Sequence, residues 1–156
     1  MGANLDDVDW AIIEQLQQEA RISLSELGRR VRLGPSATTE RVRQLEALGV
    51  ITGYRATVDL TKVGYPVLAV VRLKYPGNRH QPLHRLLDER REILECLRTT
   101  GDDCYTLKVA ATSMAHLESL VDELAGLGST TTSVVYSQPL PRRGPERPAD
   151  RTPPAG

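Results

Sequence analysis

The residues of this chain best suited to molecular recognition lie on one face of residues 35–48. At helical spacing that face carries hydroxyl, amide, carboxylate and guanidinium groups beside one small apolar residue: Ser36, Ala37, Glu40, Arg43 and Gln44. Such groups can donate and accept hydrogen bonds in the patterns that base edges present in the DNA major groove. The pattern predicts DNA binding; the alternative is an ordinary helical hairpin with a solvated outer face.

Three helices are expected to position this face. Residues 1–20 form one helix with Asp6 as its N-cap and Trp10 at the rim of its apolar stripe. A second helix is capped by Ser23, and the third begins at Pro35 and stops at Gly49. The residues of the last two helices expected to face inward share helical spacing: Leu24, Leu27, Val31, Thr38, Val42, Leu45 and Leu48.

The expected DNA contacts divide into two kinds. The residues expected to read bases are Ser36, Ala37, Thr38, Glu40 and Gln44. Arg41, Arg43 and Arg55 are better placed for phosphate, although Arg41 has the alternative of bridging Glu46 or the first helix. Arg55 lies in two β-prone runs around a Thr-Gly turn, within residues 50–58, which predict a hairpin typical of the wing of a winged helix-turn-helix domain.

The periodicity changes after residue 66. Strands are expected at residues 67–74, 93–99, 104–111 and 130–137, and helices at residues 81–91 and 113–127. The order βαββαβ predicts a ferredoxin-like sheet with both helices on one face, hence an α+β fold for the whole chain. Apolar residues are expected on the uncovered face, which favours pairing with a second subunit: Leu68, Val70, Leu94, Cys96 and Val135.

One turn of this second domain contains several polar groups with no evident structural role in the neighbouring strands. Gly101, Asp102, Asp103 and Cys104 combine free backbone N–H groups with carboxylates, a set that could hold a small zwitterion such as an amino acid. Because the turn ends two strands of the pairing sheet, Thr130 or Thr132 from a partner chain could complete the site. A plain hairpin turn is the alternative.

No enzyme constellation is found in the sequence. His80 and His84 have the spacing of two metal ligands but no evident third, and two cysteines make neither a disulfide framework nor a metal cluster. We therefore expect no catalytic activity, no metal and no cofactor. The net charge is zero, yet residues 29–43 carry five arginines against the single acid Glu40, a local basic patch compatible with DNA.

The domain organisation follows from these patterns. We expect a DNA-binding domain at residues 1–60, a linker at 61–66, an effector-binding and dimerisation domain at 67–138, and a disordered Pro/Arg-rich tail at 139–156. The chain has no long apolar run and no signal-peptide pattern, so a cytoplasmic location without membrane association is expected.

Two motifs in particular resemble the Lrp/AsnC, or feast/famine, transcription regulators: Arg-Val-Arg-Gln-Leu-Glu at residues 41–46 and Gly-Val-Ile-Thr-Gly-Tyr at residues 49–54. Further similarity lies at residues 5–9 and 20–27, and the likeness extends from about residue 4 to residue 138. The resemblance implies a bacterial-type regulator that binds double-stranded DNA, dimerises sheet to sheet, assembles often to octamers and responds to an amino acid.

The chain departs from that family's pattern at two positions. Gly34 stands where members often have a Ser N-cap, and Cys104 stands where an Asp is usual. The ammonium partner of the effector is then either lost or supplied by Asp102 or Asp103. The alternative to a transcription regulator is a metabolite-binding regulatory subunit of an enzyme, which would use the same sheet without binding DNA.

Overall fold

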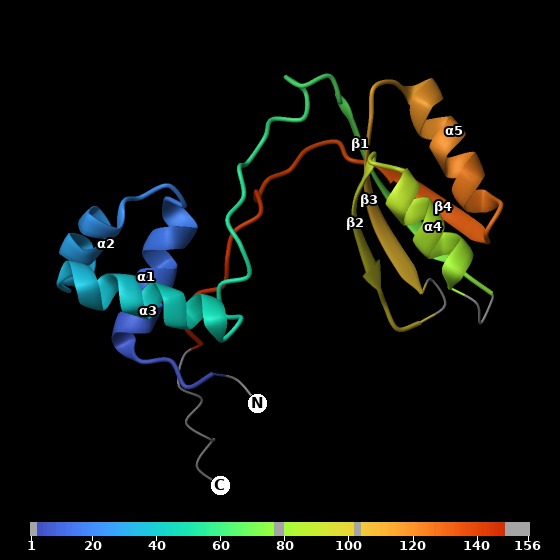
Figure 1. The fold of residues 1–156 in the computed structure, drawn as a ribbon. Helices are drawn as coiled ribbons and strands as arrows, with labels where there is room; N and C mark the ends of the chain where they lie inside the picture. Colours follow the sequence, from blue (N-terminus) through green and yellow to red (C-terminus); the bar gives the residue numbers. More distant parts are fainter. Residues whose placement is uncertain (1–2, 77–79, 102–103, 149–156) are drawn as a thin grey trace, which may run out of the picture. The chain divides into compact units, whose positions relative to one another are not determined.

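The chain folds into two compact units. The computed structural model describes residues 3–76, 80–101 and 104–148. One unit comprises the described residues of 1–56 together with residues 141–148, and the other comprises those of residues 57–140 (Figure 1). In the described part of the chain, no helix is long and apolar enough to span a lipid bilayer.

Capping interactions define the first helix, α1 (Asp7–Gln18). The Asp6 side chain accepts a hydrogen bond from the Asp9 backbone N–H at 2.9 Å, and the Asp9 carboxylate accepts one from the Asp6 N–H at 3.1 Å. This reciprocal capping box satisfies two N–H groups that a helix start leaves without partners. It confirms Asp6 as the N-cap.

A short turn joins helices α2 (Leu24–Val31) and α3 (Pro35–Ala47). The Ser23 hydroxyl accepts a hydrogen bond from the Glu26 N–H at 3.1 Å and so caps α2. The turn is made by Arg32, whose φ of 59° is left-handed and directs the chain away from α2. Ile12, Leu27, Val42 and Leu45 form the buried core beneath the three helices.

Two inward positions and one hairpin differ from the prediction. Leu24 is 41% exposed and Leu48 is 59% exposed, because they lie in the first turn of α2 and at the C-cap of α3, beyond the core. Residues 53–59 contain no β-ladder. The predicted hairpin is therefore absent from this chain, and the segment after α3 runs exposed; Tyr54 is fixed by its hydroxyl, which donates to the Glu46 carboxylate at 2.9 Å.

The second unit is a four-stranded antiparallel sheet with both helices on one face (Figure 1). Its elements follow the predicted order βαββαβ and its strands are arranged β2-β3-β1-β4. The bounds are β1 (Val67–Lys74), α4 (Gln81–Glu89), β2 (Ile93–Arg98), β3 (Tyr105–Ala111), α5 (Met114–Ala125) and β4 (Ser129–Val134).

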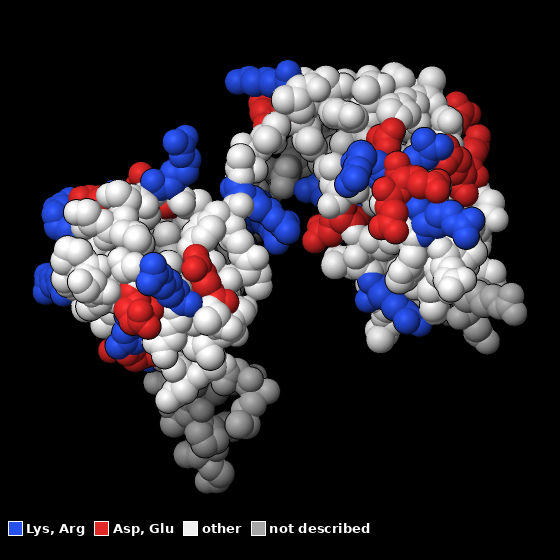
Figure 2. All heavy atoms as spheres, viewed as in Figure 1, with Lys and Arg blue, Asp and Glu red and all other residues white. Residues whose placement is uncertain are grey.

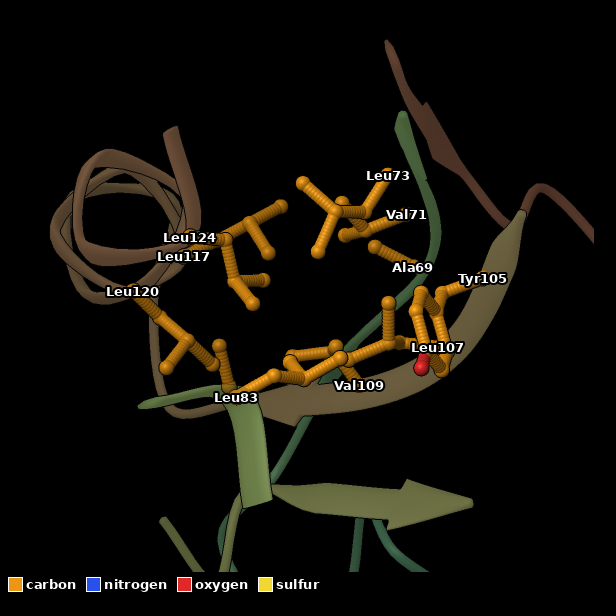
Figure 3. Close-up of a cluster of buried hydrophobic side chains, with 11 residues drawn as sticks. Ala69, Val71, Leu73, Leu83, Tyr105, Leu107, Val109, Leu117, Leu120 and Leu124 are labelled. Carbon is orange, nitrogen blue, oxygen red and sulfur yellow. The ribbon is translucent and has the colours of Figure 1, made fainter. Parts of the chain in front are cut away.

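Leucines from both helices pack onto alternate residues of the central strands. Figure 3 shows Leu83 of α4 and three leucines of α5 directed at β1 and β3. The strand residues in this cluster alternate along each strand: Ala69, Val71, Leu73, Tyr105, Leu107 and Val109. The intervening residues point to the uncovered face, where Leu68 lies opposite Ala110 and Val70 opposite Lys108, as predicted.

A β-bulge in β2 changes which side chains reach that uncovered face. Ile93 pairs with Val109 but Glu95 pairs with Lys108, so the register shifts between them. Beyond the bulge, the β2 side chains that point to each face of the sheet are therefore shifted by one residue. Cys96 lies opposite the buried Leu107 and packs on the helix-covered core, where burial raises the pKa of its thiol. The prediction that Cys96 faces the uncovered side was wrong; Leu97, 52% exposed, takes that place.

Candidate nucleic-acid interface and effector site

Close packing between α2 and α3 fixes the direction of the candidate recognition helix. At Gly28 an added Cβ would lie 2.6 Å from the Thr38 Oγ1 and 2.8 Å from the Leu33 carbonyl oxygen. The Thr38 hydroxyl itself donates to the Gly34 carbonyl at 2.9 Å. Glycine is thus required at position 28 for the two helices to approach this closely.

A pair of ion bridges holds α3 against the N-terminus of α1. The Arg41 guanidinium lies 2.7 Å from the Asp6 carboxylate and 2.8 Å from that of Asp9. Asp9 is only 8% exposed, and Arg41 satisfies it. The hydrogen bond to the Asp9 backbone N–H, followed by the contact with Arg41, lowers the pKa of Asp6. Of the bridges considered for Arg41, the one to the first helix is formed.

The opposite face of α3 is exposed and polar. Pro35, Ser36, Thr39, Glu40 and Arg43 line a shallow hollow along the helix. Within the described chain, Glu40 and Arg43 take part in no ion pair, which leaves a carboxylate and a guanidinium available to a ligand. Thr39 was not among the predicted DNA-contacting residues. Its spacing of three residues from Ser36 and four from Arg43 could have indicated that it lies on the same face of the helix.

Of the eight predicted DNA-contacting residues, six are exposed, Arg41 bridges to α1 and Thr38 is buried. Ser36, Ala37, Glu40, Arg43, Gln44 and Arg55 are exposed. Thr38 is 0% exposed and closes the contact with Gly28, so its prediction as a base-reading residue was wrong. Gln44 lies on the flank of α3 that faces the N-terminus of α1, beside Arg41 and away from the hollow.

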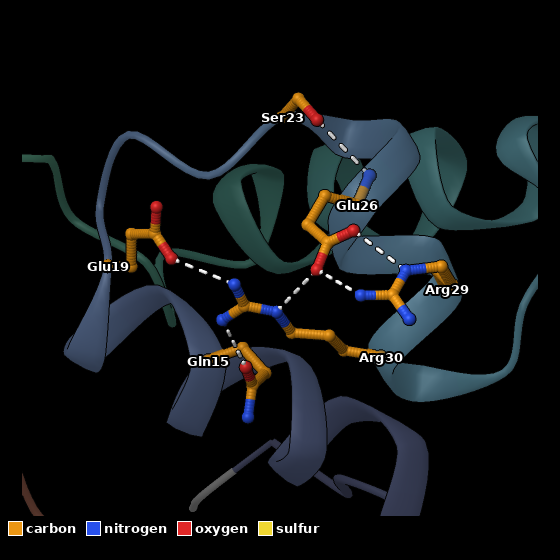
Figure 4. Close-up of polar contacts among 6 residues, drawn as sticks. All are labelled: Gln15, Glu19, Ser23, Glu26, Arg29 and Arg30. Atoms are coloured by element: carbon orange, nitrogen blue, oxygen red, sulfur yellow. Dashed lines mark hydrogen bonds and ion pairs between the residues drawn. The ribbon is translucent and has the colours of Figure 1, made fainter.

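Much of the local basic patch is neutralised internally. Figure 4 shows Glu26 between Arg29 and Arg30, and Arg30 reaching Gln15 and Glu19 of the preceding segment. The two arginines lower the pKa of Glu26 from 4.5 to about 2. Arg30 therefore joins α2 to the end of α1, and Arg41 joins α3 to the start of α1, whereas Arg29 pairs within α2. Figure 2 accordingly shows basic and acidic side chains interspersed on the drawn face.

The candidate effector turn is described at its two ends. Gly101 is exposed and has a φ of 102°, a conformation that favours glycine. Cys104 is half-buried, and its thiol accepts the Tyr75 backbone N–H at 3.4 Å, so it stabilises the end of β1. Asp102 and Asp103 lie outside the described residues.

The predicted threonine partners lie at the same end of the sheet as this turn. Tyr105, which follows Cys104, pairs with Leu73, and Leu73 pairs with Thr130 on the other side. Thr130 and the turn are thus two strand spacings apart, about 10 Å, within one chain. Thr132 is one further pleat along β4 and is exposed. A single chain does not bring these groups together.

Aromatic contacts stabilise this end of the sheet. The Tyr105 hydroxyl lies 2.8 Å from the His80 Nδ1, and the two rings pack edge to face with centroids 6.0 Å apart. His84, the other candidate metal ligand, is exposed. Among the residues that the structure describes, no three His, Cys, Asp or Glu side chains converge to hold a metal ion.

A helix-turn-helix unit with an exposed polar third helix, followed by a βαββαβ unit, defines a DNA-binding regulator with a separate ligand-binding domain. Residues 5–52 match a winged helix-turn-helix DNA-binding domain, and residues 68–145 match the Lrp/AsnC ligand binding domain. The chain belongs to the Lrp/AsnC family of transcription regulators.

Individual relatives support this assignment along nearly the whole chain. The transcriptional regulator LrpC of Bacillus subtilis is 36% identical over 134 residues, which cover 86% of this chain and 93% of LrpC. Its solved structure superposes with a TM-score of 0.83 at 35% identity, covering 87% of this chain and 97% of that one.

Two other solved relatives contain an amino acid. The feast or famine regulatory protein of Mycobacterium tuberculosis, complexed with L-methionine, has a TM-score of 0.85 and 28% identity, covering 92% of this chain and 99% of that one. A Neisseria meningitidis transcriptional regulator in complex with L-Met has a TM-score of 0.82 and 26% identity, covering 90% of this chain and 94% of that one.

Proposed function

We propose that this protein is a sequence-specific DNA-binding transcription regulator whose DNA affinity or assembly responds to an amino acid. The observation that carries the proposal is the difference between the two sides of α3. One side is fixed by Thr38 and Arg41, while the other presents Ser36, Glu40 and Arg43 around an open hollow. A helix held this firmly with a polar outer face is suited to enter a major groove.

The groups on that face suggest how it recognises DNA. Glu40 can accept a hydrogen bond from a cytosine amino group, and Ser36 can bond either base of a pair. Arg43 and Arg55 are exposed cations suited to phosphate, which fixes the position of the protein without reading sequence. Ala37 and Gln44 extend the contact toward the α1 side.

Binding to the DNA upstream of the protein's own coding region, measured by gel shift, tests this proposal. Arg43→Ala is expected to weaken binding to all sequences alike and to reduce the salt slope by about one contact per subunit. Ser36→Ala should cost about 1 kcal/mol, roughly five-fold in affinity, at particular base pairs only. Equal losses for Ser36→Ala on specific and scrambled sites would contradict direct readout by α3.

The proposed effector is a free amino acid bound at the turn of residues 101–104. Support comes from the match to the family's ligand-binding domain and from the two relatives solved with L-methionine. Since Cys104 is engaged with Tyr75, we assign the ammonium group to Asp102 or Asp103, and the partner contacts to Thr130 or Thr132 of a second chain.

A thermal-shift screen of the twenty amino acids, followed by calorimetry, tests the effector site. At least one amino acid should bind and change DNA affinity or oligomeric state. Asp102→Ala or Asp103→Ala should abolish that response and leave DNA binding without effector intact. If calorimetry detects no amino acid at millimolar concentration, the proposed effector is refuted and the regulator is ligand-independent.

Assembly is proposed to proceed through the uncovered face of the sheet. That face carries Leu68, Val70, Leu97 and Val135, and a stable sheet-to-sheet dimer commonly buries about 2,000 Å² or more. Dimers are proposed to assemble to octamers in a bacterial cytoplasm, and the protein to act by binding, without catalysis or cofactor. Light scattering should give at least a dimer at micromolar concentration, and Val70→Asp should shift it to monomer.

We assign these functions to the domains predicted from the sequence. Residues 1–60 bind DNA, residues 61–66 link the domains and residues 67–138 bind the effector and dimerise. Residues 139–156 form a tail. Its described part makes contacts that the sequence analysis did not anticipate.

A further inference from the structure

The tail segment, residues 141–148, packs with the DNA-binding unit although it follows the last strand of the other unit. The strand itself is anchored at its end, where the Val135 N–H donates to the Leu68 carbonyl at 2.8 Å. The chain thus passes between the two units twice, once after residue 56 and once before residue 141.

Both ends of one face of α1 contact the tail segment. The Gln17 side-chain amide donates to the Pro145 carbonyl at 3.2 Å, and the Arg147 guanidinium forms an ion pair with the Asp7 carboxylate. Asp7, Trp10, Glu14 and Gln17 follow one another at intervals of three or four residues, so they form a single stripe along the helix. The segment contacts this stripe at both its ends.

Gly144 lies beside the Gln17 side chain. A Cβ added at Gly144 would meet the amide end of Gln17, a flexible group that would have to shift. Residues 141–148 thus place Gly144 beside the end of α1 and Arg147 beside its acidic first turn.

The charges of the two partners are complementary. Residues 1–20 contain five acids and no base; Asp6, Asp9 and Glu19 pair with arginines of α2 and α3, which leaves Asp7 and Glu14 on the stripe. Residues 141–148 contain three arginines and one glutamate. The Asp7 and Arg147 side chains are 87% and 51% exposed, and such a solvent-screened pair is weak. A weak contact formed within one chain is reversible and depends on salt.

We propose that the acidic stripe of α1 is a docking surface for the chain's own tail segment. Docking ties the DNA-binding unit to β4 by a second connection, in addition to the linker. A shift of β4 on effector binding is then passed to α1 and, through the Asp6–Arg41–Asp9 bridge, to α3. Docking itself is independent of DNA and effector; only its role in the effector response rests on the proposed function.

Trp10, the only tryptophan in the sequence, lies on the stripe between the two contact points, so a docked segment should reduce its exposure to a quencher. Acrylamide quenching of its fluorescence in full-length protein at low salt is compared with that of a chain ended after Leu140. Arg147→Asp should raise the quenching constant to the value of the shortened chain, and Asp7→Arg should do the same. The double reversal Asp7→Arg/Arg147→Asp should restore the wild-type value.

Arg143→Asp is the matched control, because Arg143 is an exposed tail arginine without an ion pair in the described structure. It should leave quenching unchanged, and about 1 M NaCl should bring wild type to the value of the shortened chain. Equal quenching of wild type and shortened chain at low salt would overturn docking. An Arg143→Asp effect as large as that of Arg147→Asp, or failure of the double reversal, would overturn the assigned pair.

A second measurement isolates the regulatory role. In the shortened chain the ratio of DNA dissociation constants with and without the effector should fall toward one, while the affinity without effector is retained. Retention of the full ratio would overturn the coupling role even where quenching supports docking. Loss of DNA binding or effector binding by wild type would instead refute the proposed function, which the quenching assay does not involve.

Discussion

Gly28→Ala is the substitution whose effect the helix-turn-helix geometry defines most sharply. A methyl group there would lie 2.6 Å from the Thr38 Oγ1 and 2.8 Å from the Leu33 carbonyl oxygen, well below the 3.4 Å at which ordinary van der Waals contact begins. Thr38 is fully buried and the carbonyl belongs to the backbone, so neither neighbour yields easily. Overpacking of this kind costs about 1–3 kcal/mol.

The substitution also brings a gain that must be subtracted. Alanine is favoured over glycine in a helix interior by about 0.5–1 kcal/mol. The net destabilisation should be about 1–2 kcal/mol, or a fall in Tm of roughly 4–16 °C for a unit of this size. Trp10 lies in the same unit, so its fluorescence during urea or thermal unfolding reports the change.

Two controls make the result decisive. Gly34→Ala adds the same methyl group where nothing lies within 4 Å. Because Gly34 is the N-cap of α3 and alanine is a poorer N-cap than glycine, this change should lower stability by at most about 1 kcal/mol. Combining Gly28→Ala with Thr38→Ala should cost less than the sum of the two single changes, since one clash is removed. A Gly28→Ala variant as stable as wild type would refute the close-packing argument.

Three further outcomes are expected. Arg41→Ala should lower the urea midpoint and weaken binding to all DNA sequences while leaving the salt slope unchanged, because Arg41 is engaged with Asp6 and Asp9; a reduced slope would show a phosphate contact instead. Gly34→Ser should stabilise the DNA-binding unit by a few tenths of a kcal/mol, since the N-cap of α3 has no side-chain hydrogen bond; no gain in Tm would contradict this. The pKa of Glu26 is depressed from 4.5 to about 2 by Arg29 and Arg30, so its stabilising effect is complete above pH 4.5 and is lost as pH falls toward 2. Wild type should therefore exceed Glu26→Gln in stability at pH 7 by a margin that disappears near pH 2, and a margin independent of pH would contradict the pairing.

Local signals predicted most of the secondary structure. The caps at Asp6 and Ser23, and Pro35 at the start of α3, were predicted from the sequence and are present in the structure. Strand β1 was predicted over its exact residues because alternation there is uninterrupted. These features depend on neighbours within four residues, which a single sequence displays.

Features that depend on distant partners were missed. Thr38 was assigned both to the inward stripe of α3 and to base reading, and only its burial against Gly28 of another helix decides for the inward role. Residues 50–58 have β-prone composition, but a strand forms only where a partner strand supplies the ladder. The contact of the tail segment with α1 joins residues more than a hundred positions apart, and no periodicity indicates it.

The bulge in β2 also affects how residues are transferred between relatives by alignment. An alignment without gaps matches Cys96 to one residue of each relative, whichever way that residue points. In a relative whose strand lacks the bulge, the residue aligned with Cys96 would lie on the uncovered face of the sheet, and the one aligned with Leu97 would lie on the helix-covered face. Positions of β2 beyond residue 94 should therefore be matched between relatives by the β3 residues with which they pair, and not by their column in a sequence alignment.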